Sequence, residues 1–168
     1  MDATIRAAEA DDAEFLTEML VEAANWSMFH QRSRAEVLDD DNISHYVDGW
    51  PRTGDFGVVA ELAGQGTDGD QQPAGAAWCR LFDVDDPGYG YVSSLVPELT
   101  IAVREEHRGL GIGSRLIDEL LARARDLGYD GVSLSVEDAN QARELYRLKG
   151  FEIVGRNGNS DTMLCPLV

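Results

Sequence analysis

The chain has 168 residues, 43% of them hydrophobic, which suits one globular domain, residues 1–168, with a buried core. Its formal net charge is −17, and so acidic a surface repels phosphates and anionic lipids, so we expect no nucleic acid and no membrane as a partner. The acidic N-terminus lacks an apolar signal segment and no stretch reaches the ~18 apolar residues of a membrane span, so we expect a cytoplasmic protein.

The first 50 residues predict a short strand and two helices. The segment TIRAAEADD reads as a strand that leads into a helix start, where Asp11 or Asp12 can act as the cap. Residues 25–36 follow as a loop with large side chains, and residues 39–50 as a shorter helix. The first helix is predicted from apolar residues at three- and four-residue steps, namely Phe15, Leu16, Met19, Leu20 and Ala23.

Three strands are predicted in the middle of the chain. Residues 55–62 and 73–82 are the first two, and the glycine, aspartate and glutamine content of residues 63–72 is typical of an exposed hairpin loop. Residues 83–92 form a second acidic loop with a Pro-Gly turn. Residues 97–103 are the third strand, because apolar residues recur there at a period of two.

The rest of the chain alternates helix and strand. Helical periodicity extends from Gly111 to Gly128, and residues 131–136 read as a strand. Residues 139–151 form a second amphipathic helix that ends at a glycine, and two further strands follow it. This order of elements predicts an α/β (α+β) fold, with helices packed on both faces of a mixed central sheet of about six to seven strands.

A glycine-rich loop separates the third predicted strand from the long helix and contains Gly109, Gly111 and Gly113. The loop presents free backbone N–H groups at a helix N-terminus, where the dipole favours an anion and glycine lets a phosphate approach the main chain. A Walker loop would need lysine after Gly113, where Ser114 stands. A Rossmann fingerprint would need glycine at Ser114 or Leu116. A turn that only starts the helix is the alternative to a pyrophosphate cradle.

The segment Arg108-Gly109-Leu110-Gly111-Ile112-Gly113 resembles the Arg/Gln-x-x-Gly-x-Gly/Ala signature of the GNAT family of N-acetyltransferases. The order of elements fits that family over nearly the whole chain, although the part before Pro97 matches only in layout. The resemblance implies one GNAT-like domain that transfers an acetyl group from acetyl-CoA to an amine. The stretch NQARELYRLKGFEIVG is similar to a second motif of the family, at Asn140, Ala142 (one step short), Tyr146, Gly150 and Phe151.

The resemblance also implies where acetyl-CoA binds. The pantetheine arm would pair with the main chain of Ile101 and Val103, and the Ile101 N–H would polarise the thioester carbonyl. Losing such a donor typically raises the barrier by roughly 3 kcal/mol. The family splays its sheet beyond this strand, and we expect the same here. The pyrophosphate would bind Arg108, the Ser114 hydroxyl and the backbone N–H groups of Gly109, Leu110, Gly111, Ile112, Gly113 and Ser114.

Catalysis needs a base for the attacking amine, because a free alkylamine has a pKa of about 10. Family members often keep a glutamate near the start of the motif strand, which is the strand before the signature (residues 97–103 here). Glu98 is therefore the candidate base. The alternative is that Glu98 is only a solvated carboxylate at the end of a strand. Glu22 is a second candidate. Tyr146 matches the family tyrosine that faces the sulfur and is the candidate general acid, with a buried core aromatic as the alternative. Asn140 is expected to bind the pantetheine, unless it only caps its helix.

Neither a covalent enzyme intermediate nor a metal is expected. Cys79 and Cys165 lie in predicted apolar strands and read as buried fillers. His30, His45 and His107 are scattered and have no metal-ligand spacing. Binding and orienting two substrates would therefore supply most of the acceleration.

The amine acceptor of such a protein binds between the loop that joins the first two helices and the loops near the motif strand. Here those loops contain Trp26, Phe29, Tyr89 and Tyr91, and residues 39–41 add three aspartates that attract a cation. Trp26 and Phe29 packing beneath their loop is the alternative. The acceptor is expected to be a small molecule or a peptide, and a homodimer is left open.

The sequence therefore predicts an acetyl-CoA-dependent N-acetyltransferase in which a primary amine attacks directly in a ternary complex. A non-catalytic acyl-CoA-binding or sensing domain on the same fold is the alternative, because a fold does not fix a function. Tight cofactor binding without turnover of any amine would favour the sensor.

Overall fold

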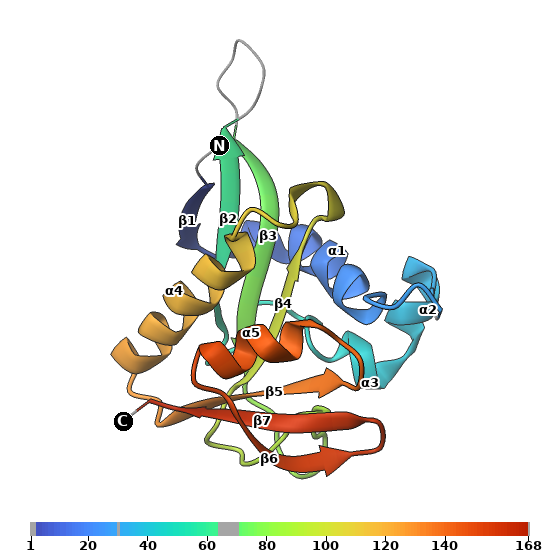
Figure 1. The fold of residues 1–168 in the computed structure, drawn as a ribbon, viewed down its shortest axis with the longest axis vertical. Coiled ribbons are helices and arrows are strands. Elements are labelled where there is room, and N and C mark those ends of the chain that lie inside the picture. Colours follow the sequence, from blue (N-terminus) through green and yellow to red (C-terminus); the bar gives the residue numbers. More distant parts are fainter. Residues whose placement is uncertain (1–2, 30, 64–70, 168) are drawn as a thin grey trace.

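Figure 1 shows the fold of the computed structural model, which describes residues 3–29, 31–63 and 71–167. Its strands are β1 (Ala3–Ala7), β2 (Phe56–Ala63), β3 (Gln71–Arg80), β4 (Glu98–Val103), β5 (Gly131–Glu137), β6 (Glu152–Asn157) and β7 (Ser160–Pro166). Within the described residues, all seven strands form one sheet in the order β1-β2-β3-β4-β5-β7-β6. Neighbouring strands are antiparallel, except that β4 and β5 are parallel.

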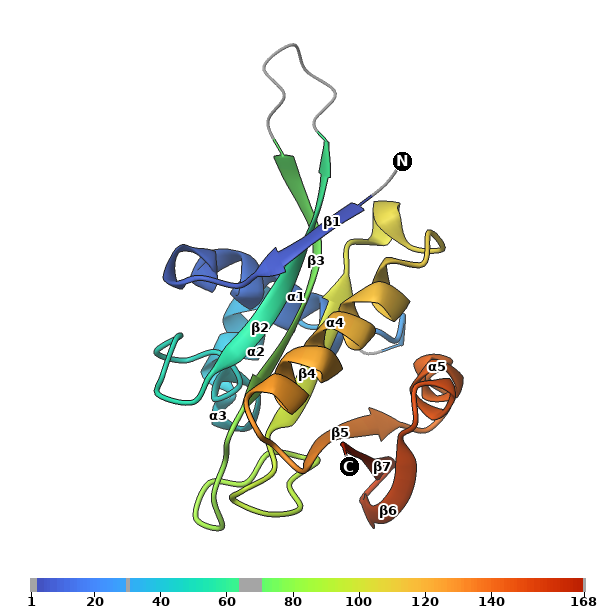
Figure 2. The ribbon, with the colours of Figure 1, turned by 90° about the vertical axis from the view of Figure 1, so that its left-hand side faces the viewer.

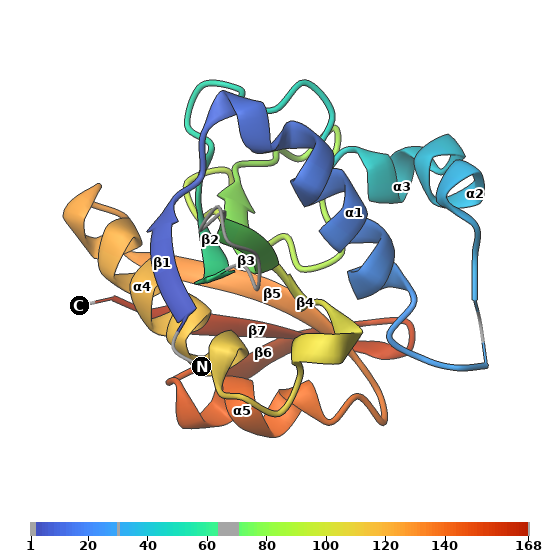
Figure 3. The same cartoon turned by 90° about the horizontal axis from the view of Figure 1, so that it is seen from above.

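Helices cover both faces of the sheet. They are α1 (Ala13–Ala24), α2 (Arg34–Asp39), α3 (Asp41–Ser44), α4 (Ile112–Asp126) and α5 (Ala142–Leu148), with short 3₁₀ turns η1 (Ala10–Asp12) and η2 (Glu105–His107). Figure 3 shows α1 and α4 on opposite sides of the sheet, where α1 packs against β3 and β4, and α4 against β2 and β3. The predicted α/β (α+β) fold, with a mixed sheet and helices on both faces, is confirmed.

Alternation along the central strands gives each helix layer its own apolar face. In β2, Val58 packs in the cluster below α4, whereas Val59 packs in the cluster below α1. In β3, Ala77 likewise packs in the cluster below α4, and Trp78 packs in the cluster below α1. All four are fully buried, and burying one aliphatic side chain of valine or leucine size contributes about 1.5–3 kcal/mol. The two clusters therefore fix both helix layers on one rigid sheet.

Helix boundaries in the N-terminal half differ from the prediction. The predicted loop of residues 25–36 contains the start of α2, because Ser33 and Glu36 form a capping box. The predicted helix of residues 39–50 contains only the short α3, which Asp40 caps by accepting a hydrogen bond from the Asn42 N–H at 3.0 Å. The predicted hairpin loop falls largely on residues 64–70, outside the described residues.

The helix predicted over residues 139–151 starts later than the periodicity suggested. Ala139 has a φ of 68°, a left-handed conformation that interrupts a right-handed helix. The Asn140 Oδ1 then accepts a hydrogen bond from the Ala142 N–H at 3.0 Å, which sets the first turn of α5. At the other end, Gly150 has a φ of 102°, in agreement with the glycine stop that the sequence predicts.

The two parallel strands in the middle of the sheet separate soon after they meet. β4 and β5 pair in register only at Glu98 and Ser133, near the beginning of both strands. Figure 1 and Figure 2 show the strands diverging from there, so that β5, β7 and β6 turn away from β1 to β4. This is the splay expected beyond the motif strand, and it leaves a gap beside the second half of β4.

Candidate active site

The main chain of β4 turns an unpaired edge toward this gap. The Pro97 carbonyl accepts a hydrogen bond from the Ser133 N–H on the β5 side, and the Arg104 N–H donates to the Ala74 carbonyl on the β3 side, at 3.0 and 2.8 Å. Successive residues of a strand direct their main-chain groups to opposite neighbours. Ile101 and Val103 therefore direct theirs toward β5, which has already diverged.

The glycine-rich loop joins this strand to α4. Gly109 and Gly111 have φ values of 79° and 80°, so both adopt the left-handed conformation that favours glycine. A Cβ added at either position would meet no atom within 4 Å, so neither glycine is needed for packing, and both border open space. Gly111 is the N-cap of α4 and has no side-chain capping bond, which leaves the first N–H groups of the helix available to an anion.

The other loop residues are distributed as a cradle requires. The Leu110 side chain is exposed, whereas Ile112 is buried and anchors the helix start. Gly113 and Ser114, in the first turn of α4, are half-buried. The residues therefore fit a pyrophosphate group, since the backbone is accessible on the side of Gly109 and Gly111 and is supported on the other.

Arg108 bridges the loop, β4 and α1. Its Nε donates to the Val103 carbonyl at 3.2 Å, and its Nη2 donates to the Glu22 carboxylate at 3.0 Å. Arg108 therefore covers one main-chain acceptor on the open edge of β4. Glu22, the second candidate base, is the partner of this arginine in an exposed ion pair.

Tyr146 approaches the gap from α5. Its side chain is half-buried and packs against the same cluster as Ile101 and Val103, with its ring centroid 6.0 Å from that of Phe151. Burial raises the pKa of Tyr146 to about 12, so the phenol keeps its proton at neutral pH. α5 therefore lies beside the start of α4, because the Leu145 Cδ2 is 3.9 Å from where a Gly113 Cβ would be.

Asn140 acts at the start of α5, as its alternative interpretation states. Its Oδ1 accepts the Ala142 N–H, which leaves its Nδ2 group for a ligand. Asp138, two residues earlier, could also have capped this helix but pairs with Arg143 at 3.2 Å and Arg156 at 2.5 Å. Contact between Asn140 and pantetheine therefore stays a prediction.

Glu98 is not the solvated strand-end carboxylate of the alternative interpretation. Its side chain is 3% exposed, and its Oε2 accepts a short hydrogen bond from the Tyr46 hydroxyl. Burial raises the pKa of Glu98 to about 7, and the hydrogen bond from Tyr46 opposes that rise. A carboxylate whose pKa is near neutrality has the proton affinity that a general base needs.

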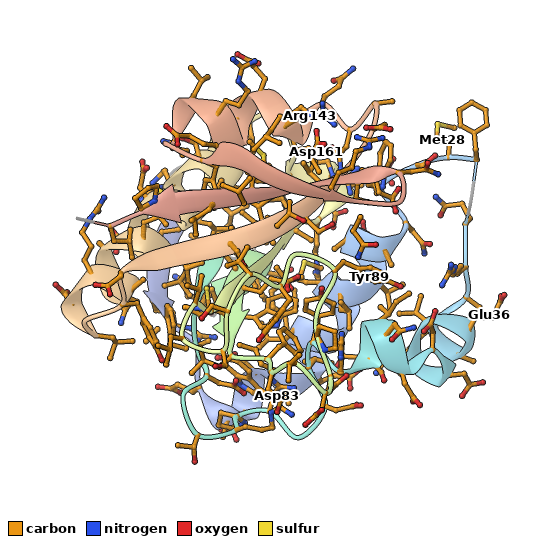
Figure 4. All side chains as sticks on the ribbon, turned by 90° about the horizontal axis from the view of Figure 1, so that it is seen from below. Met28, Glu36, Asp83, Tyr89, Arg143 and Asp161 are labelled. Carbon is orange, nitrogen blue, oxygen red and sulfur yellow. The ribbon has the colours of Figure 1, made fainter. Side chains whose placement is uncertain are left out.

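The predicted acceptor residues divide between two grooves of about 330 Å³ each. Trp26 and Phe29 line one groove, where the Trp26 Nε1 donates to the Glu137 carboxylate at 2.7 Å. Phe29 is 90% exposed, so the alternative in which it packs beneath its loop is wrong. Tyr89 and Tyr91 line the other groove, and Figure 4 shows Tyr89 away from the edge where Met28 projects.

Tyr46 is the site residue that sequence reasoning missed. In the sequence it was only one residue of the short helix predicted over residues 39–50, although it contacts Glu98 across 52 positions of the chain. No local pattern marks such a contact, because it depends on how α3 packs on the sheet. His30, which belongs to the predicted acceptor loop, lies outside the described residues.

The cysteines are buried, as predicted. Cys79 is fully buried and Cys165 nearly so, and burial raises the pKa of both thiols.

Among the described residues, no group of three or more histidine, cysteine, aspartate or glutamate side chains could hold a metal ion. No helix in the described part of the chain is long and apolar enough to cross a membrane.

Solved structures of acetyltransferases have a similar fold. A GNAT superfamily phosphinothricin acetyltransferase from Sinorhizobium meliloti, in complex with acetyl-CoA, is 25% identical with a TM-score of 0.67, and the match covers 99% of this chain and 89% of that one. A putative acetyltransferase from Salmonella typhimurium, with its cofactor acetyl-CoA, is 19% identical with a TM-score of 0.68 over 100% and 95% of the two chains. The second likeness shows the fold alone.

Curated proteins and a family model also match the sequence. The L-methionine sulfoximine/L-methionine sulfone acetyltransferases of Pseudomonas paraeruginosa and Pseudomonas aeruginosa are 38% identical over 60 residues. That match spans only 35% of this chain and 35% of the length of those relatives. The model of the acetyltransferase (GNAT) family matches residues 18–151, most of the chain. The chain therefore belongs to the GNAT family of acetyltransferases.

Proposed function

We propose that this protein transfers the acetyl group of acetyl-CoA to the primary amine of a small molecule or peptide. The observation that carries the proposal is the unpaired edge of β4, which leads directly into a glycine loop with uncapped N–H groups. An extended chain with amide groups can pair with such an edge, and a pyrophosphate can occupy such a loop. Acetyl-CoA carries both groups on one molecule.

The cofactor would be held from β4 to α4. The main chain of Ile101 and Val103 would pair with the pantetheine amides, and the N–H groups from Gly109 to Ser114 would bind the pyrophosphate. Arg108 would leave the Val103 carbonyl and turn to the phosphates, since it bonds both Val103 and Glu22 through an exposed guanidinium. The remaining Nδ2 group of Asn140 would donate to the pantetheine arm.

The chemistry follows from the groups around the gap. The amine nitrogen forms a bond to the acetyl carbon, and the carbon–sulfur bond breaks. The Ile101 N–H would stabilise the negative charge on the carbonyl oxygen. Tyr146 would give its proton to the leaving sulfur, and the proton of the amine would reach Glu98. Because Glu98 is 3% exposed, that proton would travel along a chain of water molecules rather than by direct contact with the acceptor.

The acceptor would be a small amino compound of the amino-acid type. The curated relatives are named for amino-acid derivatives, L-methionine sulfoximine and L-methionine sulfone, and this motivates the choice although they match only 60 residues. The grooves beside Trp26 and Tyr89 are small, which favours an acceptor of few atoms. Acidic side chains at the acceptor loops attract its ammonium group.

A thiol-release assay with acetyl-CoA and a panel of amines tests this function. The panel should contain amino acids and their sulfone or sulfoximine derivatives, peptides, polyamines and aminoglycosides, and longer acyl donors should be included. We expect release of coenzyme A with at least one amino-acid-type amine. Tight binding of acetyl-CoA without turnover of any amine would instead identify an acyl-CoA sensor.

A further inference from the structure

Tyr46, just after α3, joins the candidate base to the acceptor loop through one hydroxyl group. This hydroxyl donates a hydrogen bond to the Glu98 Oε2 and accepts one from the Tyr89 N–H at 2.8 Å. Tyr46 is 7% exposed, so both bonds are shielded from competing water. One buried atom therefore connects β4 with the loop that contains Tyr89 and Tyr91.

The surroundings of Tyr46 hold its ring in one place. The ring packs edge-on against His45 and Phe82, with centroid distances of 4.8 and 5.0 Å. The Tyr46 carbonyl accepts the Trp78 Nε1–H at 2.9 Å, which fixes the backbone against β3. A hydroxyl held this rigidly can orient a carboxylate without further loss of side-chain entropy.

The loop fits closely over Glu98. A Cβ added at Gly88 would lie 2.2 Å from the Glu98 Oε1, and one added at Gly90 would lie 2.5 Å from the main-chain carbon of Leu134 in β5. The loop therefore passes between the carboxyl group and β5, beside the point where β4 and β5 separate. Any movement of this loop would change the space around Glu98.

We propose that Tyr46 is a positioning residue that sets the Glu98 carboxylate and the acceptor loop in one shared arrangement. The inference rests on the proposed function, in which Glu98 takes the proton of the acceptor amine. Without the Tyr46 hydroxyl, the carboxylate would lose its only side-chain hydrogen-bond donor among the described residues, and the Gly90 backbone would remain to lower its pKa. The Tyr89 N–H would lose its acceptor at the same time.

Other charged and titratable groups around Glu98 are already engaged or neutral. Arg80, the partner of Glu98 in the β3–β4 register, is bound to Asp55 at 2.7 Å. Cys79 of β3 is a buried thiol with a raised pKa, so it stays neutral. His45 bonds Asp86 through its Nδ1 at 2.9 Å. On the β5 side the facing side chain is the neutral hydroxyl of Ser133.

The direction of the effect follows from the hydrogen bond. A donor to a carboxylate stabilises its charged form and lowers its pKa, so removing the Tyr46 hydroxyl raises the pKa of Glu98 further above its ordinary value. A base acts only when it is deprotonated. The rising acid limb of the rate profile must therefore move to higher pH in Tyr46→Phe.

The first test is the pH dependence of kcat/KM for an accepted amine. Tyr46→Phe should lose about tenfold at pH 6, since a hydrogen bond to a charged group is worth at least a factor of ten, and much less at pH 9. The affinity for acetyl-CoA should stay unchanged. Tyr129→Phe is the control, because Tyr129 stacks on Phe56 and has no bond to Glu98. An equal loss at every pH would overturn the proposal.

The second test does not depend on turnover. In protein labelled with ¹³C at glutamate carboxyl groups, Glu98 is assigned with Glu98→Gln, and its resonance is followed against pH. Tyr46→Phe should raise the titration midpoint of Glu98 and speed hydrogen exchange of the Tyr89 amide. An unmoved midpoint overturns the role of Tyr46. Absence of turnover in the unaltered protein contradicts only the proposed function, and the titration still decides the inference.

Discussion

Glu98 and Tyr146 belong to opposite faces of the sheet. The partner of Glu98, Tyr46, belongs to the core cluster below α1, whereas Tyr146 packs in the cluster below α4. The base candidate and the acid candidate are therefore separated by the strand whose edge would hold the thioester. This separation suits a direct transfer, because the amine loses its proton on one side and the sulfur gains one on the other.

Replacing Tyr146 tests the acid. Tyr146→Phe should lower kcat by about 10²-fold or more, which is typical of a lost general acid, and leave the dissociation constant of acetyl-CoA unchanged. Steady-state kinetics and calorimetry measure the two quantities, with Tyr129→Phe as the control. A variant that keeps its kcat would show that Tyr146 is only a packed aromatic.

Glu98 should also make stability depend on pH. The pKa of Glu98 in the folded protein, about 7, is above its unfolded value, so its neutral form is favoured by folding. Its contribution is fully present below the unfolded pKa and is lost as pH rises toward 7, by an amount of about 3 kcal/mol. Urea unfolding at pH 5 and pH 8 should show Glu98→Gln gaining stability relative to the unaltered protein at pH 8. Equal differences at both pH values would contradict the raised pKa.

At the level of elements, α1 and the glycine loop are joined by two ion pairs. Glu22 pairs with Arg108 at 3.0 Å, and Glu18, one turn earlier, pairs with Arg104 at 2.6 Å. Only Arg108 also bonds the open edge of β4, through Val103. The Glu22–Arg108 pair therefore holds Arg108 over the edge of β4 where the pantetheine arm would bind. The Glu18–Arg104 pair holds no side chain over that edge.

This difference predicts the result of removing each carboxylate. Glu22→Gln should tighten acetyl-CoA binding by up to about fivefold, since an exposed ion pair is worth at most about 1 kcal/mol, and should retain turnover. Glu18→Gln should change neither the affinity for acetyl-CoA nor turnover. Calorimetry and the thiol-release assay supply the values. Loss of turnover in Glu22→Gln would instead support Glu22 as a catalytic base.

The elements differ in how well the sequence predicts them. The strands and α4 follow from periodicity, because both are set by residues close in the chain. The separation of β4 and β5 after Glu98 and Ser133 could be expected only from the family resemblance, since strand pairing is a long-range property. The bond from Tyr46 to Glu98 was missed for the same reason. α2 was missed although Ser33 and Glu36 form a local capping signal.

For the whole molecule, the net charge of −17 is the dominant property. Its carboxylates repel one another in the folded state, and salt shortens the Debye length from about 10 Å at 0.1 M to about 3 Å at 1 M. We therefore expect the melting temperature to rise between low and molar NaCl, as scanning calorimetry can show. No rise would contradict a net destabilising repulsion between these carboxylates.

The central claim is that the glycine loop and the open edge of β4 bind acetyl-CoA. Gly111 and Gly128 offer a matched pair, because both have positive φ, at 80° and 89°, and both border open space at opposite ends of α4. Alanine strains the backbone equally at each position, but only at residue 111 does the new methyl group enter the cradle.

Calorimetric titration of acetyl-CoA into the unaltered chain and these two variants is the most direct measurement. We predict one binding site in the unaltered protein, clearly weaker binding in Gly111→Ala, and unchanged binding in Gly128→Ala. No binding heat from the unaltered protein, or the same affinity in all three, would contradict the account.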